Sequence, residues 1–336
     1  MARTLDELAA LSGVSRATVS RVINGGPVAE KTRRRVLAVL EQSNYRPNLA
    51  ARALASGRSD IIGVVVHGAP SVLFQDPYFA LLLQGLTEAL AERAVGMMTW
   101  LGNRTKEETL HRILGMGLLD GVIVTADQLV DPLVDGLLAS DLPTVLIGHR
   151  REDRTASYVD VDNITAADLV TRHLIGLGRR RIGHIAGTRA TVAGEDRLSG
   201  YLAAMGWADL STGGLIEEGD FGAGTGRWAA EILLERGVDA LFCANDATAA
   251  GALEAIHQAG LRVPEDVAVA GFDDLDFAAR LDPPLTTIRQ GIERQGIEAA
   301  HTLFQLLENP KGGARRVVLP TELVVRQSTV GGAAQR

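Results

Sequence analysis

From residue 61 onward, almost continuously apolar runs of four to six residues alternate with longer segments of helical periodicity. Examples are the runs 61–66, 121–124 and 144–147, and the same rhythm restarts near residue 158. A strand that is buried on both faces needs such a run, and strands separated by helices form parallel sheets. The pattern therefore predicts an α/β architecture of doubly wound parallel sheets, with enough chain for two of them. Such sheets bind ligands at the carboxyl ends of their strands.

The first sixty residues have a different pattern, which predicts short helices. Thr4 and Glu7 have the spacing of a capping box, and Gly13 suits the left-handed turn that ends a helix. Ser15 can cap a second helix, 16–24, that turns Val19 and Val22 or Ile23 inward. A small residue at position 9, the turn glycine and Val19 together give the spacing of a helix-turn-helix, although a plain helical hairpin uses the same residues.

The side chains predicted to lie outside on the second helix favour DNA binding over a plain hairpin. Arg16 and Arg21 can each donate two hydrogen bonds to guanine, and Ala17 and Thr18 can contact a thymine methyl group. Thr18 and Ser20 can equally bind phosphate oxygens. Residues 1–60 hold ten lysines and arginines against five acids, a charge of +5, within a chain whose net charge is −7. The basic segment is thus the part expected to contact a polyanion.

A third helix is predicted at 31–42, with three arginines in its first turn and four aliphatic residues facing inward: Val36, Leu37, Val39 and Leu40. Asn48 then caps a short helix, 49–55, that is too short to be stable alone. Residues 56–59 follow as a linker.

These segments resemble the DNA-binding head of the LacI/GalR family of bacterial repressors, in SGVSRATVSRVIN, KTRRRV, NYRPN and AARALASGR. The resemblance implies that Arg16, Ala17 and Arg21 contact bases. It also implies that the short helix is a hinge that orders when two subunits meet on DNA, and that Leu54 wedges into the minor groove. Ala29 stands where the family usually has a hydroxylated helix cap. The DNA-contacting residues predicted in this way are Thr4, Ser15, Arg16, Ala17, Thr18, Ser20, Arg21, Asn24, Tyr45, Asn48, Ala51, Leu54 and Ala55.

The rest of the chain resembles the periplasmic-binding-protein-like sensor domain of the same family, in DPYFALLLQGL, YVDVDN, DRLSGYLAAM, CANDATAAGAL and GLRVPEDVAVAGFDDL. The resemblance implies two lobes, crossed three times by the chain, with a cleft between them. The expected domains are a head, 1–47; a hinge and linker, 48–60; an effector-binding and dimerisation domain, 61–330; and a tail, 331–336. Lobe 1 is expected to comprise about 61–161 and 290–320, and lobe 2 about 162–289 and 321–330.

Polar and aromatic residues near strand ends are the predicted effector site. Arg197 matches the arginine with which the family binds its ligand, and a guanidinium fork suits adjacent sugar hydroxyls. The alternative is a structural salt bridge to Glu195 or Asp196. Of the neighbours Asn245 and Asp246, and of Asp273 and Asp274, one is expected to face the cleft and the other to cap a helix. The full prediction is Asp76, Tyr78, Phe79, Thr125, His149, Arg197, Phe221, Asn245 and Asp273, where core packing also explains Phe79 and Phe221.

Several other functions are disfavoured by the sequence. No long apolar run or leader-like segment indicates a membrane span or secretion, and the one cysteine, Cys243, is expected to be buried and inert. The histidines lack metal-ligand spacing, no nucleophile accompanies Asp273 and Asp274, and 222–227 lacks the ending of a phosphate-binding loop. No enzyme activity, metal or cofactor is expected.

The prediction is a cytoplasmic transcriptional regulator, by default a repressor, that binds a pseudo-palindromic operator as a homodimer. Its effector is expected to be a saccharide. A nucleobase, a nucleoside or a protein partner is the alternative.

Overall fold

The computed structural model describes residues 4–23, 26–43, 45, 58–66, 76–101, 105–125, 128–149 and 155–331. The chain divides into two compact units, 1–59 and 60–336, and each is described by itself. No helix among the described residues is long and apolar enough to cross a membrane.

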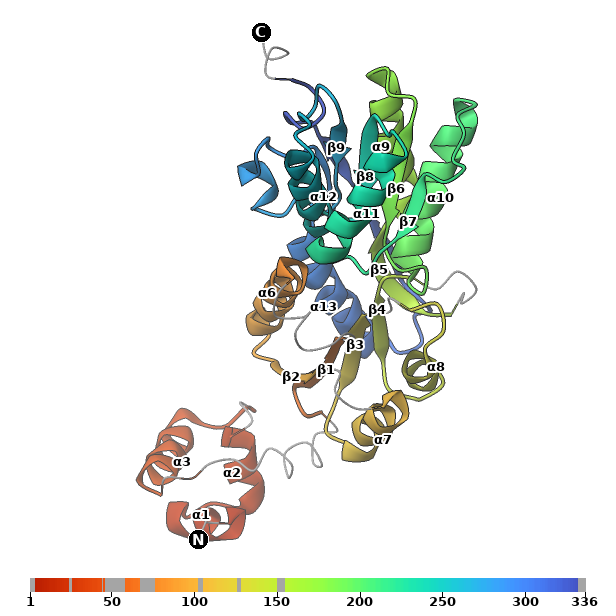
Figure 1. Ribbon diagram of the computed structural model, residues 1–336. Helices are drawn as coiled ribbons and strands as arrows, with labels where there is room; N and C mark the ends of the chain where they lie inside the picture. Colours follow the sequence, from red (N-terminus) through yellow and green to blue (C-terminus); the bar gives the residue numbers. More distant parts are fainter. Residues whose placement is uncertain are drawn as a thin grey trace. The chain divides into compact units, whose positions relative to one another are not determined.

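Three helices lie in the described part of the smaller unit, drawn in red in Figure 1: α1 (Leu5–Ser12), α2 (Arg16–Ile23) and α3 (Glu30–Gln42). The predicted capping box is present: the Glu7 amide donates to Thr4 Oγ1 (3.3 Å), and the Thr4 amide donates to Glu7 Oε2 (3.1 Å). Gly13 ends α1 with a φ of 61°. The Thr18 amide donates to Ser15 Oγ (3.2 Å), so Ser15 caps α2 as predicted.

The core of this unit is formed by Leu8, Val19, Val22 and Val36, all buried. The prediction that Leu37 faces inward is wrong, because 48% of this residue is exposed. Its neighbours Val36, Val39 and Leu40 follow the i, i+3, i+4 spacing of one helix face, and Leu37 lies about 100° around the helix from Val36.

The larger unit contains a six-stranded parallel sheet in the order β11-β5-β4-β3-β1-β2. Both of its faces are covered by helices. In β1, Val64 belongs to the apolar cluster with α6 and α13, while Val65 belongs to the cluster with α7 and α8. This two-sided burial explains the continuously apolar strands. The elements are β1 (Ile61–Val66), β2 (Gly96–Leu101), β3 (Gly121–Thr125), β4 (Thr144–Ile147), β5 (Ser157–Val161), β11 (Arg316–Leu319), α6 (Pro77–Glu92), α7 (Lys106–Met116), α8 (Pro132–Leu138) and α13 (Ile292–Glu308).

A second parallel sheet has the order β7-β6-β8-β9. Phe242 of β8 packs in the cluster that includes α9 and α10 residues, whereas Leu241 and Cys243 pack in the cluster that includes α11 and α12 residues. Cys243 is buried and free, as predicted. The elements are β6 (Ile182–Ala186), β7 (Ile216–Glu218), β8 (Ala240–Cys243), β9 (Ala268–Ala270), α9 (Asn163–Gly176), α10 (Val192–Trp207), α11 (Ala223–Glu235) and α12 (Asp246–Gln258).

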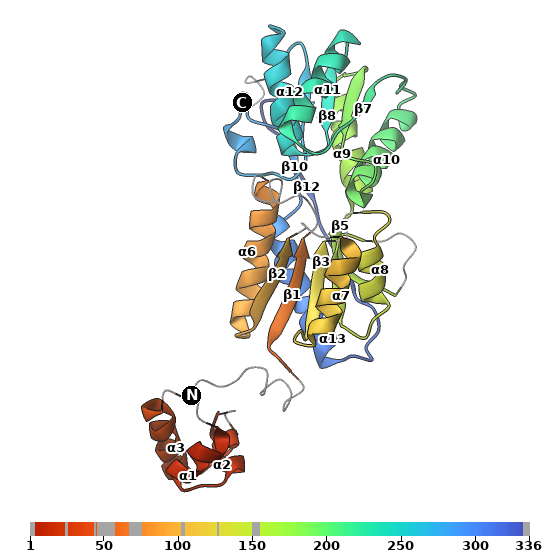
Figure 2. The same cartoon turned by 60° about the horizontal axis from the view of Figure 1, so that its bottom comes forward.

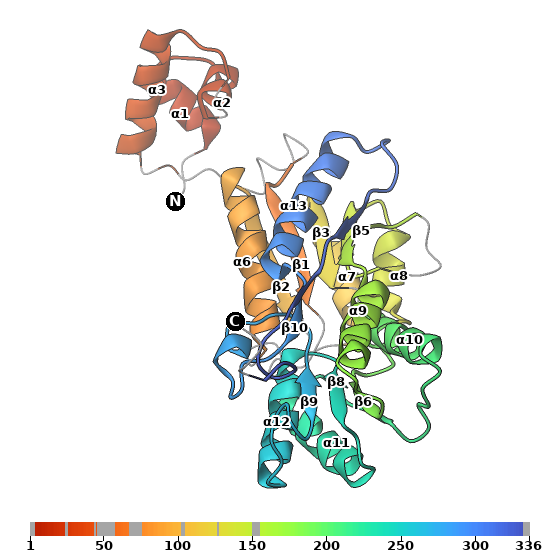
Figure 3. The same ribbon diagram turned by 90° about the horizontal axis from the view of Figure 1, so that it is seen from above.

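Three chain segments connect the two sheets, as Figures 2 and 3 show. The chain leaves the first sheet after β5 and enters α9. It returns between β10 (Thr287–Arg289) and α13, and it leaves again after β11 to form β12 (Glu322–Val324). The strands β10 and β12 pair with each other in antiparallel register. The short 3₁₀ helix η1 (Ala278–Arg280) precedes β10.

Candidate functional site

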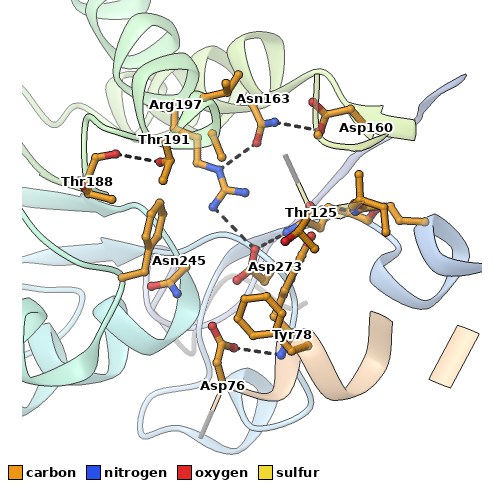
Figure 4. Close-up of a pocket in the computed structure, with 18 of the residues that line it drawn as sticks. Asp76, Tyr78, Thr125, Asp160, Asn163, Thr188, Thr191, Arg197, Asn245 and Asp273 are labelled. Atoms are coloured by element: carbon orange, nitrogen blue, oxygen red, sulfur yellow. Dashed lines mark hydrogen bonds and ion pairs between the residues drawn. The ribbon is translucent and has the colours of Figure 1, made fainter. Parts of the chain in front are cut away.

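A cavity of about 280 Å³ lies within the larger unit, where strands of both sheets end (Figure 4). This volume is close to the lower end of the range of about 300–1,000 Å³ that is usual for small-molecule sites. Eight of the nine residues that we predicted from strand ends and from the family resemblance line this cavity: Asp76, Tyr78, Phe79, Thr125, Arg197, Phe221, Asn245 and Asp273.

Arg197 is buried in the wall of the cavity and is held on three sides. Its Nε donates to Asn163 Oδ1 (3.0 Å), its Nη1 donates to the carbonyl oxygen of Ala244 (2.6 Å), and its guanidinium lies 3.7 Å from the centre of the Phe272 ring. Nη2 donates no hydrogen bond to the described residues, and its N–H groups are suited to oxygen atoms of a ligand. The predicted alternative, a salt bridge to a neighbour on the same helix, is wrong. Glu195 pairs with Arg189, and the carboxylate near Arg197 is Asp273.

Asp273 faces Arg197 from the end of β9, with 3.8 Å between Oδ1 and Nη1. Its backbone has a φ of 116°, and its amide donates to the carbonyl oxygen of Ile288 (2.8 Å). Gln290 Nε2 also donates to Asp273 Oδ1. Burial raises the pKa of this carboxyl group well above its usual value, and Arg197 opposes that rise. Burial likewise lowers the pKa of Arg197, against the effect of Asp273.

Asn245 and Asp246 do not divide their roles as we predicted. Asn245 lines the cavity and also caps α12, because its Oδ1 accepts from the Thr248 amide (2.9 Å). Asp246 is buried behind the wall, where it accepts from Thr287 Oγ1 (2.5 Å) and the Leu275 amide (2.8 Å). Burial raises its pKa to about 7.

Asp274 also turns away from its neighbour Asp273. Its two carboxylate oxygens accept from Arg326 (2.6 Å) and Arg289 (2.7 Å). The neighbouring carboxylates Asp273 and Asp274 therefore have separate partners, and this arrangement does not give the paired acid and base that hydrolysis of a sugar bond would need.

Asp76 begins α6 and places two aromatic residues at the cavity. Its Oδ1 accepts from the Tyr78 amide (2.9 Å), and Pro77 occupies the first helical position, so α6 starts two residues before the predicted 79. The rings of Tyr78 and Phe79 pack edge to face, 5.2 Å apart. Burial raises the pKa of both Asp76 and Tyr78.

Phe221 lines the cavity, and its own backbone has a φ of 69°, which is unusual for a residue with a large side chain. Its ring packs against Gly187, where a Cβ atom would lie 2.1 Å from the ring. The preceding Asp220 also lines the cavity, and its Oδ1 accepts from the Gly222 amide (2.9 Å) and Thr225 Oγ1 (2.5 Å).

The structure places His149 beside the cavity, not on its described wall. Its Nδ1 hydrogen-bonds Asp160 Oδ2 (2.7 Å), and its Nε2 lies 3.6 Å from Asp196 Oδ2. Asp160 itself lines the cavity and was not predicted.

Sequence reasoning missed further polar lining residues. Four of them follow a strand by one or two positions, which is the criterion that selected Asn245: Asn163, Thr188, Asp220 and Gln290. The other missed residues lie inside a strand, on a loop or at the first turns of helices, where the sequence pattern carries no such signal: Gln128, Asp160, Thr191 and Gln295.

The smaller unit places the predicted base-contacting residues on one helix. Arg16, Ala17 and Arg21 of α2 are exposed, and Thr18 and Ser20 are half-buried. Arg16 lies 3.6 Å from Asp6 in an exposed ion pair. Thr4 and Ser15 are exposed caps, and Tyr45 packs against the core. The predicted residues Asn24, Asn48, Ala51, Leu54 and Ala55 lie outside the described part of the chain.

Comparison with known proteins places both units in one family. Residues 4–48 match the family described as "Bacterial regulatory proteins, lacI family", and residues 171–329 match the "Periplasmic binding protein-like domain". The HTH-type transcriptional regulator CelR of Thermobifida fusca is 39% identical over 332 residues, which are 97% of this chain and 98% of that protein. The chain belongs to the lacI family. It is therefore a transcriptional regulator with a helix-turn-helix head and an α/β sensor unit of parallel sheets.

Other family members agree with this assignment. The HTH-type transcriptional repressor PurR of Photobacterium profundum is 32% identical over 97% of this chain and 98% of that protein. Among solved structures, a CelR–cellobiose complex is 37% identical with a TM-score of 0.77, covering 97% of this chain and 99% of that one. A Lac repressor dimer bound to operator and the anti-inducer ONPF is 28% identical with a TM-score of 0.87, covering 98% and 99% of the two chains.

Proposed function

We propose that this lacI-family regulator represses transcription as a homodimer on a pseudo-palindromic operator in the bacterial cytoplasm, and that a saccharide in the cavity controls it. The observation that carries the effector assignment is the buried Arg197, whose Nη2 has no hydrogen-bond partner among the described residues. It lies in a wall rich in amides and hydroxyls. Adjacent hydroxyl groups of a sugar match the donors of a guanidinium fork.

The aromatic residues of the cavity support the same class of effector. Tyr78 and Phe79 lie on one lobe and Phe221 on the other, and all three line the cavity. Sugar rings present apolar C–H faces, and aromatic side chains cover such faces well. A similar protein, CelR, has been solved as a complex with cellobiose, so cellobiose is the first saccharide to test.

We assign DNA contact to the exposed residues of α2, above all Arg16, Ala17 and Arg21. Residues 48–60 are proposed as the hinge, 61–330 as the effector-binding and dimerisation domain, and Leu54 as the wedge at the operator centre. Binding of the effector would change the closure of the two lobes and, through it, the spacing of the two hinges in a dimer.

The test measures cellobiose and purine bases against the full-length chain by titration calorimetry, followed by binding of an operator selected from random DNA. We expect cellobiose to bind and to change the operator affinity. Binding of a purine base in place of cellobiose would transfer the effector role to the alternative class. No change in operator affinity with any bound compound would overturn control through the cavity.

Arg197→Lys tests the residue that carries the proposal. Lysine keeps the positive charge beside Asp273 but lacks the planar fork, so cellobiose should bind about 30-fold more weakly, since a hydrogen bond to a charged group contributes about 1.5–3 kcal/mol. Arg189→Lys is the matched control, because Arg189 pairs with Glu195 and does not line the cavity. Equal loss in both variants, or none in Arg197→Lys, would remove Arg197 from the ligand site.

A further inference from the structure

Several helices of the larger unit begin at the cavity, and this arrangement bears on the charge of the ligand. The first residues or cap residues of α6, α9, α10 and α12 line it, and so do residues that precede the caps of α11 and α13. The start of a helix presents unpaired amide groups and the positive end of its dipole, so it ordinarily attracts phosphate and other anions. A cavity with several such ends is suited to a phosphorylated ligand unless the side chains oppose it.

Here the chain's own side chains accept hydrogen bonds at several of these helix starts. Asp76 caps α6 by accepting from the Tyr78 amide. Asp220 lies two residues before Gly222, the cap residue of α11, and accepts from the Gly222 amide. Thr191 and Asn245 accept from amides of α10 and α12 in the same way, at 3.1 and 2.9 Å. Asp76 and Asp220 thus already place a carboxyl group beside the starts of α6 and α11, and a ligand phosphate would have to approach these groups.

The charged side chains of the described wall also disfavour an anionic ligand. Its acidic side chains outnumber its basic ones by four to one: Asp76, Asp160, Asp220 and Asp273 against Arg197. The one cation of this described wall, Arg197, already faces Asp273 at 3.8 Å. Asp220 remains ionised at neutral pH, because hydrogen bonds from Thr225 and the Gly222 amide lower the pKa of its carboxyl group.

We propose that the cavity selects uncharged ligands and excludes their phosphorylated forms, and that Asp220, with Asp76, determines this specificity from the helix ends. The inference rests on the proposed effector role of the cavity. It narrows the effector to a free saccharide or, if the effector is a nucleobase derivative, to one without phosphate.

The experiment compares matched pairs of compounds on the full-length chain by calorimetry: cellobiose with cellobiose 6-phosphate, glucose with glucose 6-phosphate, and adenosine with AMP. For each pair in which a member binds, we expect the phosphorylated form to bind at least about 100-fold more weakly, since two like charges a few ångströms apart in a protein site repel by several kcal/mol. Tighter binding of any phosphorylated member than of its uncharged partner would overturn the proposal.

Asp220→Asn removes the charge and keeps an acceptor for the Gly222 amide, because the side-chain oxygen of asparagine bonds the backbone two residues on as that of aspartate does. In this variant the discrimination between cellobiose and its phosphate should shrink about tenfold or more, by loss of one repulsive charge. Asp239→Asn is the control. Asp239 also accepts from two backbone amides (2.8 and 3.0 Å), but it precedes β8, whereas the cavity lies beyond the end of that strand. Unchanged discrimination in Asp220→Asn, or an equal change in Asp239→Asn, would overturn the role of Asp220.

The matched compound pairs distinguish the saccharide assignment from the proposed selection of uncharged ligands. Binding of adenosine without AMP or cellobiose would overturn the saccharide assignment and support the selection of uncharged ligands. Binding of cellobiose 6-phosphate in preference to cellobiose would keep a sugar effector and overturn the selection. Failure of every uncharged compound to bind would overturn both.

Discussion

At the scale of single residues, His184 is the side chain whose burial has the clearest consequence for stability. It is fully buried in β6, stacked between Tyr201 and Phe242 with ring centres 4.9 and 4.7 Å away. Its Nδ1 lies 2.9 Å from the carbonyl oxygen of Phe242, and its Nε2 has no hydrogen-bond partner in the part of the chain that the structure describes. Because a charge on this ring would be buried, the pKa of His184 falls to about 4.

This shift predicts a loss of stability in mild acid. An unfolded histidine has a pKa near 6.5, so at pH 5 the unfolded chain takes up a proton that folded His184 does not. The free energy of unfolding should therefore fall as the pH drops from about 7 toward 4, with about 2 kcal/mol lost between pH 7.5 and 5.0 on account of this residue.

His184→Phe should remove that part of the pH dependence while keeping the aromatic stack. The measurement is urea unfolding at the two pH values, followed by tryptophan fluorescence, since Trp100, Trp207 and Trp228 all lie in the larger unit. A variant that loses as much stability as the wild type between the two pH values would show that other groups cause the acid sensitivity.

Arg197 shows what sequence can and cannot predict at this scale. Its position after a buried strand and its family match placed it correctly on the cavity wall. The alternative, a salt bridge to Glu195 or Asp196, rested on sequence proximity and is wrong. The fold supplies Asn163, Ala244 and Asp273 as partners. Asp273, 76 positions along the chain, becomes the counter-ion because β6, which leads into α10, and β9, which leads to Asp273, belong to the same sheet.

At the scale of elements, the three helices of the smaller unit differ in how they begin. The chain caps α1 with Thr4 and α2 with Ser15, but α3 begins after Ala29 without a side-chain cap. Three arginines lie near its start, where the helix dipole disfavours positive charge. The start of α3 is thus the least stabilised of the three helix starts.

Ala29→Ser should supply the missing acceptor and stabilise the start of α3 by about 1 kcal/mol. Hydrogen exchange of the full-length chain, read on the α3 peptides, measures the effect as slower exchange. Thr4→Ala is the opposite change at α1, with a cost of about 1 kcal/mol and faster exchange there. Equal exchange of α3 in Ala29→Ser and in the wild type would mean that another group already satisfies those amides.

Elements with two buried faces or a side-chain cap were the ones predicted well. The runs that became β1 and β4 have the predicted bounds, because double-sided burial leaves an unbroken apolar signature. The packing of helix on helix was not predictable. A Cβ atom on Gly251 would lie 1.9 Å from the Ala223 carbonyl oxygen, and one on Gly226 would lie 2.2 Å from that of Thr248, so these glycines let α11 and α12 meet backbone to backbone. In the sequence they are ordinary helical glycines.

At the scale of the whole molecule, control of DNA binding by a saccharide requires a coupling free energy between the two units. Such coupling is reciprocal: if cellobiose changes the operator affinity by some factor, the operator must change the cellobiose affinity by the same factor. Calorimetry with and without operator measures both, and unequal factors would show that the two ligands do not act through one common equilibrium.

Variants in the two units should separate binding from coupling. Leu54, outside the described residues, is the predicted wedge, and Leu54→Ala should weaken operator binding about tenfold or more, since unstacking a base step costs a few kcal/mol that the wedge contributes to offset. The cellobiose affinity of the DNA-free protein should not change, because Leu54 belongs to the smaller unit and the cavity to the larger. Arg197→Lys should have the opposite effects: it should weaken the binding of cellobiose and leave the operator affinity measured without cellobiose unchanged. If Leu54→Ala alters cellobiose affinity without DNA, the head and the cavity are coupled even in the free protein, and control does not depend on the hinge meeting its operator.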